Sequence, residues 1–207
     1  MQNKIYLFSA TSHVDAIHVN SLDFDFFQPD IDFSNYDYLV LTSKKAIDAL
    51  QFYKKENYID IPALCISRFT KEYYESFGGK VLEVGGGIGS DLQKIIDTYP
   101  KEKKWLYLRA KEIAGEGFSV DEAVVYESRC SDEILNFRLQ DDNSTLIFTS
   151  PSSVECFLKN NSFSSNHNII VIGETTAKSL PTKINYNISD KTSIQSCIDI
   201  ALKFKKN

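Results

Sequence analysis

The sequence predicts an α/β protein made of two similar domains with parallel sheets. Short apolar segments alternate with amphipathic segments along the chain, which is typical of strands and helices in such sheets. The same order of segments occurs twice, at a nearly constant offset. The 207 residues are 43% apolar and 25% charged, so the chain is long enough and apolar enough to bury a sizeable core.

The alternation predicts the elements in order, beginning with a strand over residues 4–8 (KIYLF). Further strands are expected over residues 36–43, 61–67, 80–84, 104–109, 121–129, 145–150, 168–173 and 184–189. Helices are expected over residues 44–55, 70–78, 91–99, 151–160, 175–180 and 192–204. Gly78 and Gly79 end the second helix and Pro100 ends the third, because glycine favours the helix C-cap and proline does not continue a helix.

The internal repeat is the most informative feature. Residues 39–50 (LVLTSKKAIDAL) match residues 146–158 (LIFTSPSSVECFL), with Ser150 lying 107 positions after Ser43. Residues 66–70 (ISRFT) match residues 172–176 (IGETT) at an offset of 106. Weaker matches join 90–96 to 192–198 and 5–9 to 106–110, at offsets of 102 and 101. A slowly falling offset indicates two copies of one α/β unit.

The two copies are interleaved in the chain. The first strand has no Thr-Ser turn directly after it, so we expect it to join the C-terminal copy. This predicts a discontinuous domain, residues 1–22 and 128–207, with a second domain, residues 25–126, inserted in it. The chain would cross between them near residues 18–24 and 122–130. Both crossings are rich in residues that favour extended backbone, so they could pair as a two-stranded antiparallel linker.

Charge and cysteine usage exclude several classes of protein. The chain carries 23 basic and 28 acidic residues, a net charge of −5, which disfavours a general nucleic-acid binder. No apolar run approaches the ~18 residues of a membrane helix, and no signal segment opens the chain. Cys65, Cys130, Cys156 and Cys197 are far apart and form no CxxC or Cys/His cluster. We therefore expect a cytoplasmic protein with reduced, mostly buried thiols and no metal.

Hydroxyl side chains recur at the turns between strands and helices. In a parallel sheet these turns lie at the carboxyl edge, where ligands bind, and helix N-termini attract anions. The turns concerned contain Thr42 and Ser43, Ser67 to Thr70, Gly89 and Ser90, Thr149 and Ser150, and Gly173 to Thr176. The simpler interpretation is that serine and threonine only cap helices. Matching turns in both copies keep a shared anion-binding cleft open as the alternative.

A glycine-rich turn suggests another class. Residues 80–91 (KVLEVGGGIGSD) look like the first motif of S-adenosylmethionine-dependent methyltransferases, where glycines let the backbone approach the cofactor. Those enzymes also need an acid at the end of the next strand, which here ends in Leu108 and Arg109. The equivalent turn of the other copy, residues 189–193 (SDKTS), has no glycine. A loop that needs positive φ is the competing interpretation.

The order of motifs resembles the uroporphyrinogen-III synthase family over about residues 38–202. The sharpest matches are residues 124–126 (VVY), 148–152 (FTSPS) and 172–177 (IGETTA). The resemblance implies two flavodoxin-like α/β domains joined by a two-stranded antiparallel linker, with the active site in the cleft between them. It also implies closure of linear hydroxymethylbilane to uroporphyrinogen III, with inversion of ring D and loss of water, in tetrapyrrole (haem) biosynthesis. No cofactor and no metal are implied, and we expect a monomer.

The resemblance also places the site. The family's tyrosine at the end of the interdomain strand falls on Tyr126, which is the expected catalytic residue. The expected substrate-binding residues are Ser43, Thr70, Ser150, Gly173, Thr175 and Thr176. A non-catalytic two-lobed protein that binds small anions remains the alternative, because a fold does not determine a function.

The chain departs from the family at two places that are equivalent in the repeat. Family members commonly have a helix of about three turns after the first strand, whereas here residues 8–11 lead almost at once into the linker. The segment that follows Ala110 is also short, and Ala110 replaces a common glycine.

Overall fold

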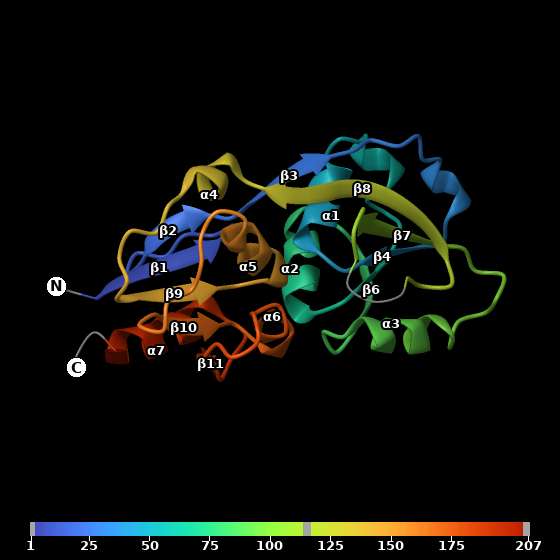
Figure 1. Cartoon of the computed structure of the whole chain (residues 1–207). Coiled ribbons are helices and arrows are strands. Elements are labelled where there is room, and N and C mark those ends of the chain that lie inside the picture. The colour runs from blue at the N-terminus through green and yellow to red at the C-terminus, as the bar shows by residue number, and fades with distance from the viewer. Residues whose placement is uncertain (1–2, 114–116, 205–207) are drawn as a thin grey trace. The chain divides into compact units, whose positions relative to one another are not determined.

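The computed structural model describes residues 3–113 and 117–204 and contains two sheets in which the strands are parallel except for one edge pair (Figure 1). The chain divides into two compact units, Met1–Asp23 with Arg129–Asn207, and Phe24–Ser128. The mixed α/β class expected from the alternating pattern is confirmed.

The first unit has a five-stranded sheet in the order β11-β10-β9-β1-β2. Its strands are β1 (Lys4–Ser9), β2 (Ile17–Asn20), β9 (Ser144–Phe148), β10 (Asn168–Val171) and β11 (Tyr186–Ile188). All four neighbouring pairs are parallel. Ile5 lies opposite Thr145 and Phe8 lies opposite Phe148, so the N-terminal strand joins the C-terminal copy, as the repeat predicts.

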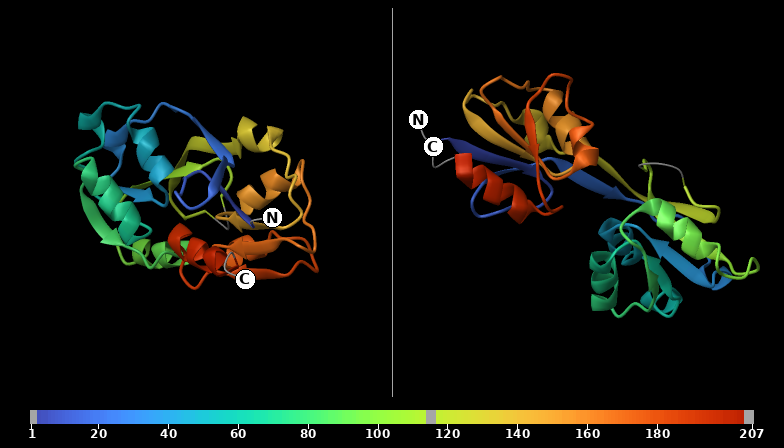
Figure 2. Two further views of the ribbon diagram at one scale, coloured as in Figure 1. Left: turned by 90° about the vertical axis from the view of Figure 1, so that its left-hand side faces the viewer. Right: turned by 90° about the horizontal axis from the view of Figure 1, so that it is seen from below.

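Helices cover both faces of this sheet: α4 (Asp132–Asn136), α5 (Pro151–Leu158) and α6 (Glu174–Ala177) on one, and α7 (Ile194–Phe204) on the other (Figures 1 and 2). The alternation along β9 produces these layers, because successive side chains of a strand point to opposite faces. Leu146 and Phe148 pack against Phe157 of α5. Ile147, between them, packs against Ile198 of α7.

The second unit has a six-stranded sheet in the order β3-β8-β7-β4-β5-β6. Its strands are β3 (Leu22–Phe26), β4 (Tyr38–Leu41), β5 (Ala63–Cys65), β6 (Val81–Val84), β7 (Trp105–Ala110) and β8 (Asp121–Cys130). Its helices are α1 (Lys44–Leu50), α2 (Arg68–Ser76) and α3 (Gly89–Ile96), with short 3₁₀ turns at Phe33–Asn35 and Lys55–Asn57. Leu39 and Leu41 pack toward α1, whereas Val40 packs against Leu92 of α3 on the opposite face.

The two sheets repeat one strand order. The sequence matches pair β4 with β9, β5 with β10, and β7 with β1, and each matched strand holds the same place in its sheet. Two connections between neighbouring parallel strands are unusually short. Such a connection normally takes a crossover of about a dozen residues, which is usually helical. Residues 10–16 join β1 to β2, and residues 111–120 join β7 to β8. Neither contains a helix in its described part, as expected from the shortened sequence.

The chain segments that link the two units lie side by side. Strand β3 neighbours β8 in the sheet, and both strands extend across the division between the units. The amide of Phe27 donates to the carbonyl of Val125 at 2.9 Å, and the amide of Ser131 donates to the carbonyl of Ser21 at 3.2 Å. Residue numbers rise on one strand as they fall on the other, which is the order of an antiparallel pair.

Helix boundaries differ from expectation where caps intervene. The helix expected over residues 70–78 begins at Arg68, because the Ser67 hydroxyl accepts from the Thr70 amide at 3.3 Å and starts it earlier. The helix ends at Ser76, two residues before the predicted end, while the stop signal at Gly78 is confirmed. Gly78 has φ +86°, and its amide bonds to the Glu75 carbonyl at 2.8 Å.

Candidate functional site

Ser43 and Tyr126, both expected in the site, are brought into contact. Ser43 follows β4 and caps α1, where its Oγ accepts from the amide of Ala46 at 3.2 Å. The same Oγ forms a 2.8 Å hydrogen bond with the hydroxyl of Tyr126. Tyr126 lies on β8, which is separated from β4 by β7. A register shift after Arg109 places Tyr126 opposite Ala110, near the carboxyl end of the sheet.

The surroundings of Tyr126 keep its phenol protonated. The side chain is half-buried, and its ring centroid lies 6.3 Å from that of Phe24 and 6.4 Å from that of Phe26. Burial raises the pKa of Tyr126 above its usual value near 10.0, and the hydrogen bond to Ser43 opposes part of that rise. At neutral pH the phenol can therefore donate a proton, while Ser43 is placed to stabilise the oxygen left behind.

A second hydroxyl pair lies beside the first, and its tyrosine was missed by the sequence analysis. Thr42 Oγ1 and the hydroxyl of Tyr107 are 3.0 Å apart. Thr42 directly precedes Ser43, and Tyr107 lies on β7, next to β4. The only sequence signal for Tyr107 is one hydroxyl among the apolar residues at the start of β7.

Thr70, the matching candidate in the next turn, is less accessible than expected. Its side chain is only 4% exposed and lies in the first turn of α2. Its Oγ1 is 3.2 Å from the Oγ of Ser67, the residue that caps this helix. Any contact of this turn with a ligand would therefore involve main-chain amides more readily than the threonine hydroxyl.

The candidates of the first unit lie at two neighbouring turns, after β9 and β10. Ser150 caps α5 reciprocally with Ser153, each hydroxyl accepting from the other residue's amide at 3.1–3.2 Å. Gly173 precedes α6 in extended backbone, with φ 179°. Thr175 is exposed, whereas Thr176 is only 3% exposed. Helix capping thus accounts for the Ser150 hydroxyl, and Thr175 is the accessible hydroxyl of the neighbouring turn.

The glycine-rich turn after β6 has a structural explanation. Gly87 has φ +93°, which favours glycine. A Cβ at Gly85 would lie 2.5 Å from Leu92 Cδ2, so a side chain there would clash with α3. The interpretation as a loop that needs positive φ is confirmed at Gly87.

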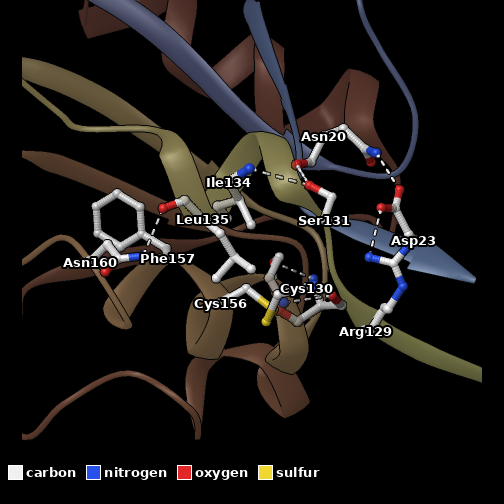
Figure 3. The surroundings of a disulfide bond; sticks show 12 residues. Asn20, Asp23, Arg129, Cys130, Ser131, Ile134, Leu135, Cys156, Phe157 and Asn160 are labelled. Carbon is white, nitrogen blue, oxygen red and sulfur yellow. Dashed lines mark hydrogen bonds and ion pairs between the residues drawn. A yellow bond between two sulfur atoms is a disulfide. The ribbon is translucent and has the colours of Figure 1, made fainter.

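The expectation of four reduced thiols is wrong for two of them. Cys130 and Cys156 form a disulfide (Figure 3). Their separation of 26 residues gave no local signal, but α4 returns the chain so that the end of β8 meets α5. Around the bond, Ser131 caps α4 by accepting from the Ile134 amide at 3.2 Å. Cys65 and Cys197 are free and buried, and burial raises the pKa of the Cys65 thiol to about 12.

Among the described residues, no three His, Cys, Asp or Glu side chains gather in an arrangement that could hold a metal ion. None of the helices in the described ranges has the length and apolar character needed to cross a membrane.

The repeated sheets define a duplicated α/β protein, in which hydroxyl-bearing turns form a candidate ligand site at the carboxyl edge of each sheet. The sequence model described as uroporphyrinogen-III synthase HemD matches residues 10–199. The chain belongs to the uroporphyrinogen-III synthase family, whose members are cyclising lyases of tetrapyrrole synthesis. The family that the order of motifs suggested is therefore confirmed. Neither the methyltransferase nor the non-catalytic interpretation is favoured.

Solved structures agree with this assignment. The crystal structure of uroporphyrinogen-III synthetase from Helicobacter pylori 26695 is similar with a TM-score of 0.82 and 26% identity, covering 98% of this chain and 99% of that one. A mutant uroporphyrinogen III synthase from Thermus thermophilus has a TM-score of 0.58 at 11% identity, covering 98% of each chain, and shows the fold alone. A search of curated protein sequences gave no match.

Proposed function

We propose that this synthase closes hydroxymethylbilane to uroporphyrinogen III with Tyr126 as the group that assists departure of the substrate hydroxyl. The observation that carries the proposal is the 2.8 Å hydrogen bond between Tyr126 and Ser43. It holds the phenol in one orientation at the carboxyl end of the sheet, where ligands of α/β proteins bind. The raised pKa of Tyr126 keeps it in the proton-donating form.

In the proposed chemistry, the proton that Tyr126 gives up is returned to it by the end of the reaction. Tyr126 protonates the hydroxyl as the C–O bond breaks, water leaves, and a cationic azafulvene remains. The Ser43 hydroxyl donates to the phenolate oxygen while the charge persists. Ring D then attacks through its substituted carbon to give a spiro intermediate, and rearrangement and closure release a proton that restores the phenol.

Positioning contributes most of the catalysis in this proposal. Unassisted closure gives the type I isomer, so the enzyme must hold the chain for attack through the substituted carbon of ring D. We assign the carboxylates of the substrate to the turns that carry Ser43, Thr70, Ser150, Gly173, Thr175 and Thr176. Because Thr70 and Thr176 are almost fully buried, main-chain amides would serve at their turns, while Thr175 offers an accessible hydroxyl.

We further propose that the units act as two domains, residues 1–22 with 128–207 and residues 25–126, joined through paired strands. Two observations support this arrangement. The chain divides into compact units near Asp23 and Ser128, and β3 lies next to β8 in the sheet. We expect a monomer that acts in the cytoplasm. From the sequence, the cytoplasmic location is expected because the cysteines are expected to be reduced. The Cys130–Cys156 disulfide removes that reason, so the proposed location rests on the family alone.

The test is an isomer assay on the purified chain. Hydroxymethylbilane is supplied, and the uroporphyrinogens formed are separated. We expect the type III isomer from the natural chain and a turnover about 5- to 150-fold lower for Tyr126→Phe, the effect of one hydrogen bond lost in a transition state. Only type I product from the natural chain would contradict the synthase activity. Normal turnover of Tyr126→Phe would assign Tyr126 to packing.

A further inference from the structure

Tyr107 has a buried ring and a single polar contact. Its side chain is only 5% exposed and packs within the apolar cluster between the sheet and α3. Its ring lies edge-on to Phe118 with centroids 4.7 Å apart. The hydrogen bond to Thr42 Oγ1, at 3.0 Å, is the one partner of its hydroxyl within the described chain. A phenylalanine ring would fill the same space, so the role left for the Tyr107 hydroxyl is its hydrogen bond with Thr42.

Tyr107 and Tyr126 reach consecutive residues from opposite faces of the sheet. Tyr107 belongs to the cluster on the α3 face, whereas Tyr126 packs on the cluster beneath α1 and α2. Their hydroxyls meet Thr42 and Ser43, the two residues that connect β4 to α1. The turn is therefore anchored from both sides.

This double anchoring bears on the geometry of the proposed proton donor. The Ser43 hydroxyl is shared between the Ala46 amide and the Tyr126 hydroxyl, so its position depends on the backbone at residues 42–43. Thr42 is half-buried, and its hydroxyl bonds to Tyr107 alone among the described residues. Loss of that bond would allow the turn to shift, and displacements of about 1 Å in a catalytic arrangement can cost up to ~100-fold in rate.

We propose that Tyr107 is a positioning residue of the synthase, which holds Thr42 and through it fixes Ser43 against Tyr126. Tyr107 does not touch the substrate in this proposal. It acts on the step in which the substrate hydroxyl leaves and on the orientation from which ring D attacks. The inference rests on the proposed role of Tyr126.

The experiment compares Tyr107→Phe, Thr42→Val and the double variant. Each single change removes one hydroxyl and keeps the shape of the side chain. We expect kcat to fall about five- to tenfold in each, which is the effect of one neutral hydrogen bond, with KM changed less than twofold. The double variant should fall no further, because both changes remove the same bond. The fraction of type I isomer should rise in all three.

Tyr38→Phe is the matched control. Tyr38 packs on the same face of the same sheet, with its ring centroid 4.6 Å from that of Trp105, and its hydroxyl has no hydrogen-bond partner among the described residues. This variant should keep the natural kcat and isomer ratio. Thermal unfolding of every variant shows how much of it is folded at the assay temperature, so that kcat can be calculated for the folded enzyme alone.

The outcomes separate this inference from the role of Tyr126. If Tyr107→Phe leaves kcat and the isomer ratio unchanged while Tyr126→Phe lowers turnover, the positioning role is wrong and the proton donor stands. If Tyr107→Phe and Thr42→Val lower kcat additively, the two residues act separately and the inference is also wrong. If Tyr126→Phe has no effect, the proposed donor fails, whatever Tyr107 does.

Discussion

The hydroxyl oxygens of Ser43 and Tyr126 lie 2.8 Å apart although 83 residues separate them in the chain. The contact requires the parallel strands β4, β7 and β8 to lie side by side, and it depends on the register shift after Arg109 that places Tyr126 opposite Ala110. It also gives Ser43 two tasks, because the same oxygen accepts from the Ala46 amide and begins α1. These two tasks can be separated by substitution.

We expect Ser43→Ala to lower the free energy of unfolding by about 1 kcal/mol, because it removes a helix cap. It should also lower kcat, because Tyr126 loses its partner. In a double-mutant cycle with Tyr126→Phe, the effects on kcat should be coupled by about 1 kcal/mol. Ser67→Ala removes an equivalent cap from α2, without a tyrosine partner, and its effects should add to those of Tyr126→Phe. Additive effects of Ser43→Ala would show that the hydrogen bond is not used in catalysis.

The raised pKa of Tyr126 predicts the alkaline behaviour of the enzyme. The proton-donating form dominates below the pKa, so kcat should not fall through ionisation of Tyr126 until the pH exceeds 10. Initial rates measured between about pH 6 and pH 10 test this. A fall in kcat with a midpoint near 8 that is absent from Tyr126→Phe would contradict it.

Raised tyrosine pKa values also predict how the stability of the folded chain depends on pH. Burial raises the pKa of both Tyr107 and Tyr126 in the folded chain above the unfolded value near 10.0. Their contribution to stability is therefore complete below that value and is lost as the pH rises through the folded pKa values. Urea unfolding at a series of pH values should show this loss above pH 10, and it should be smaller in Tyr107→Phe.

At the turn before α6, we expect obstruction of the backbone amides to weaken substrate binding more than loss of a side-chain hydroxyl does. A Cβ at Gly173 would meet Thr192 Cγ2 at an ordinary 3.4 Å, so Gly173→Ala should fold as the natural chain does. The greater bulk of Gly173→Val should obstruct the first amides of α6 and raise KM strongly. Thr176→Ala should weaken binding by only about 1 kcal/mol. Steady-state KM values of the variants distinguish obstruction of the backbone amides from loss of the Thr176 hydroxyl. Thermal unfolding of each variant is the control for folding. A larger effect in Thr176→Ala would identify the hydroxyl as the holder of the substrate.

The disulfide predicts a difference in stability between oxidised and reduced protein. A closed loop of 26 residues corresponds to about 3.5 kcal/mol in the chain-entropy account. The variant with both Cys130→Ala and Cys156→Ala should lose about that much, and dithiothreitol should destabilise the natural chain but not the variant. Thiol titration of the unreduced, denatured chain should find Cys65 and Cys197 alone. Reaction of all four cysteines would contradict the bond.

Much of the fold follows from pattern. The offset between Ser43 and Ser150 predicts that both follow equivalent strands, and the structure places them after β4 and β9. The first strand lacks its own turn, and it pairs with β9 as that lack predicts. The short strand β2 and the helix α4 were not predicted as elements. Both are brief, and their stability depends more on the sheet and helices around them than on local propensity.

The order and spacing of residues along the chain were enough to establish the alternation of elements, the duplication, the family, and Ser43 and Tyr126 as candidates. They did not show that these two side chains touch, that Tyr107 holds Thr42, or that Cys130 bonds to Cys156, which emerged only from the folded chain. The burial of Thr70 and Thr176 emerged there as well. Hydrogen bonds, disulfides and burial depend on distances through space, and strand register and helix packing set those distances between residues far apart in the chain.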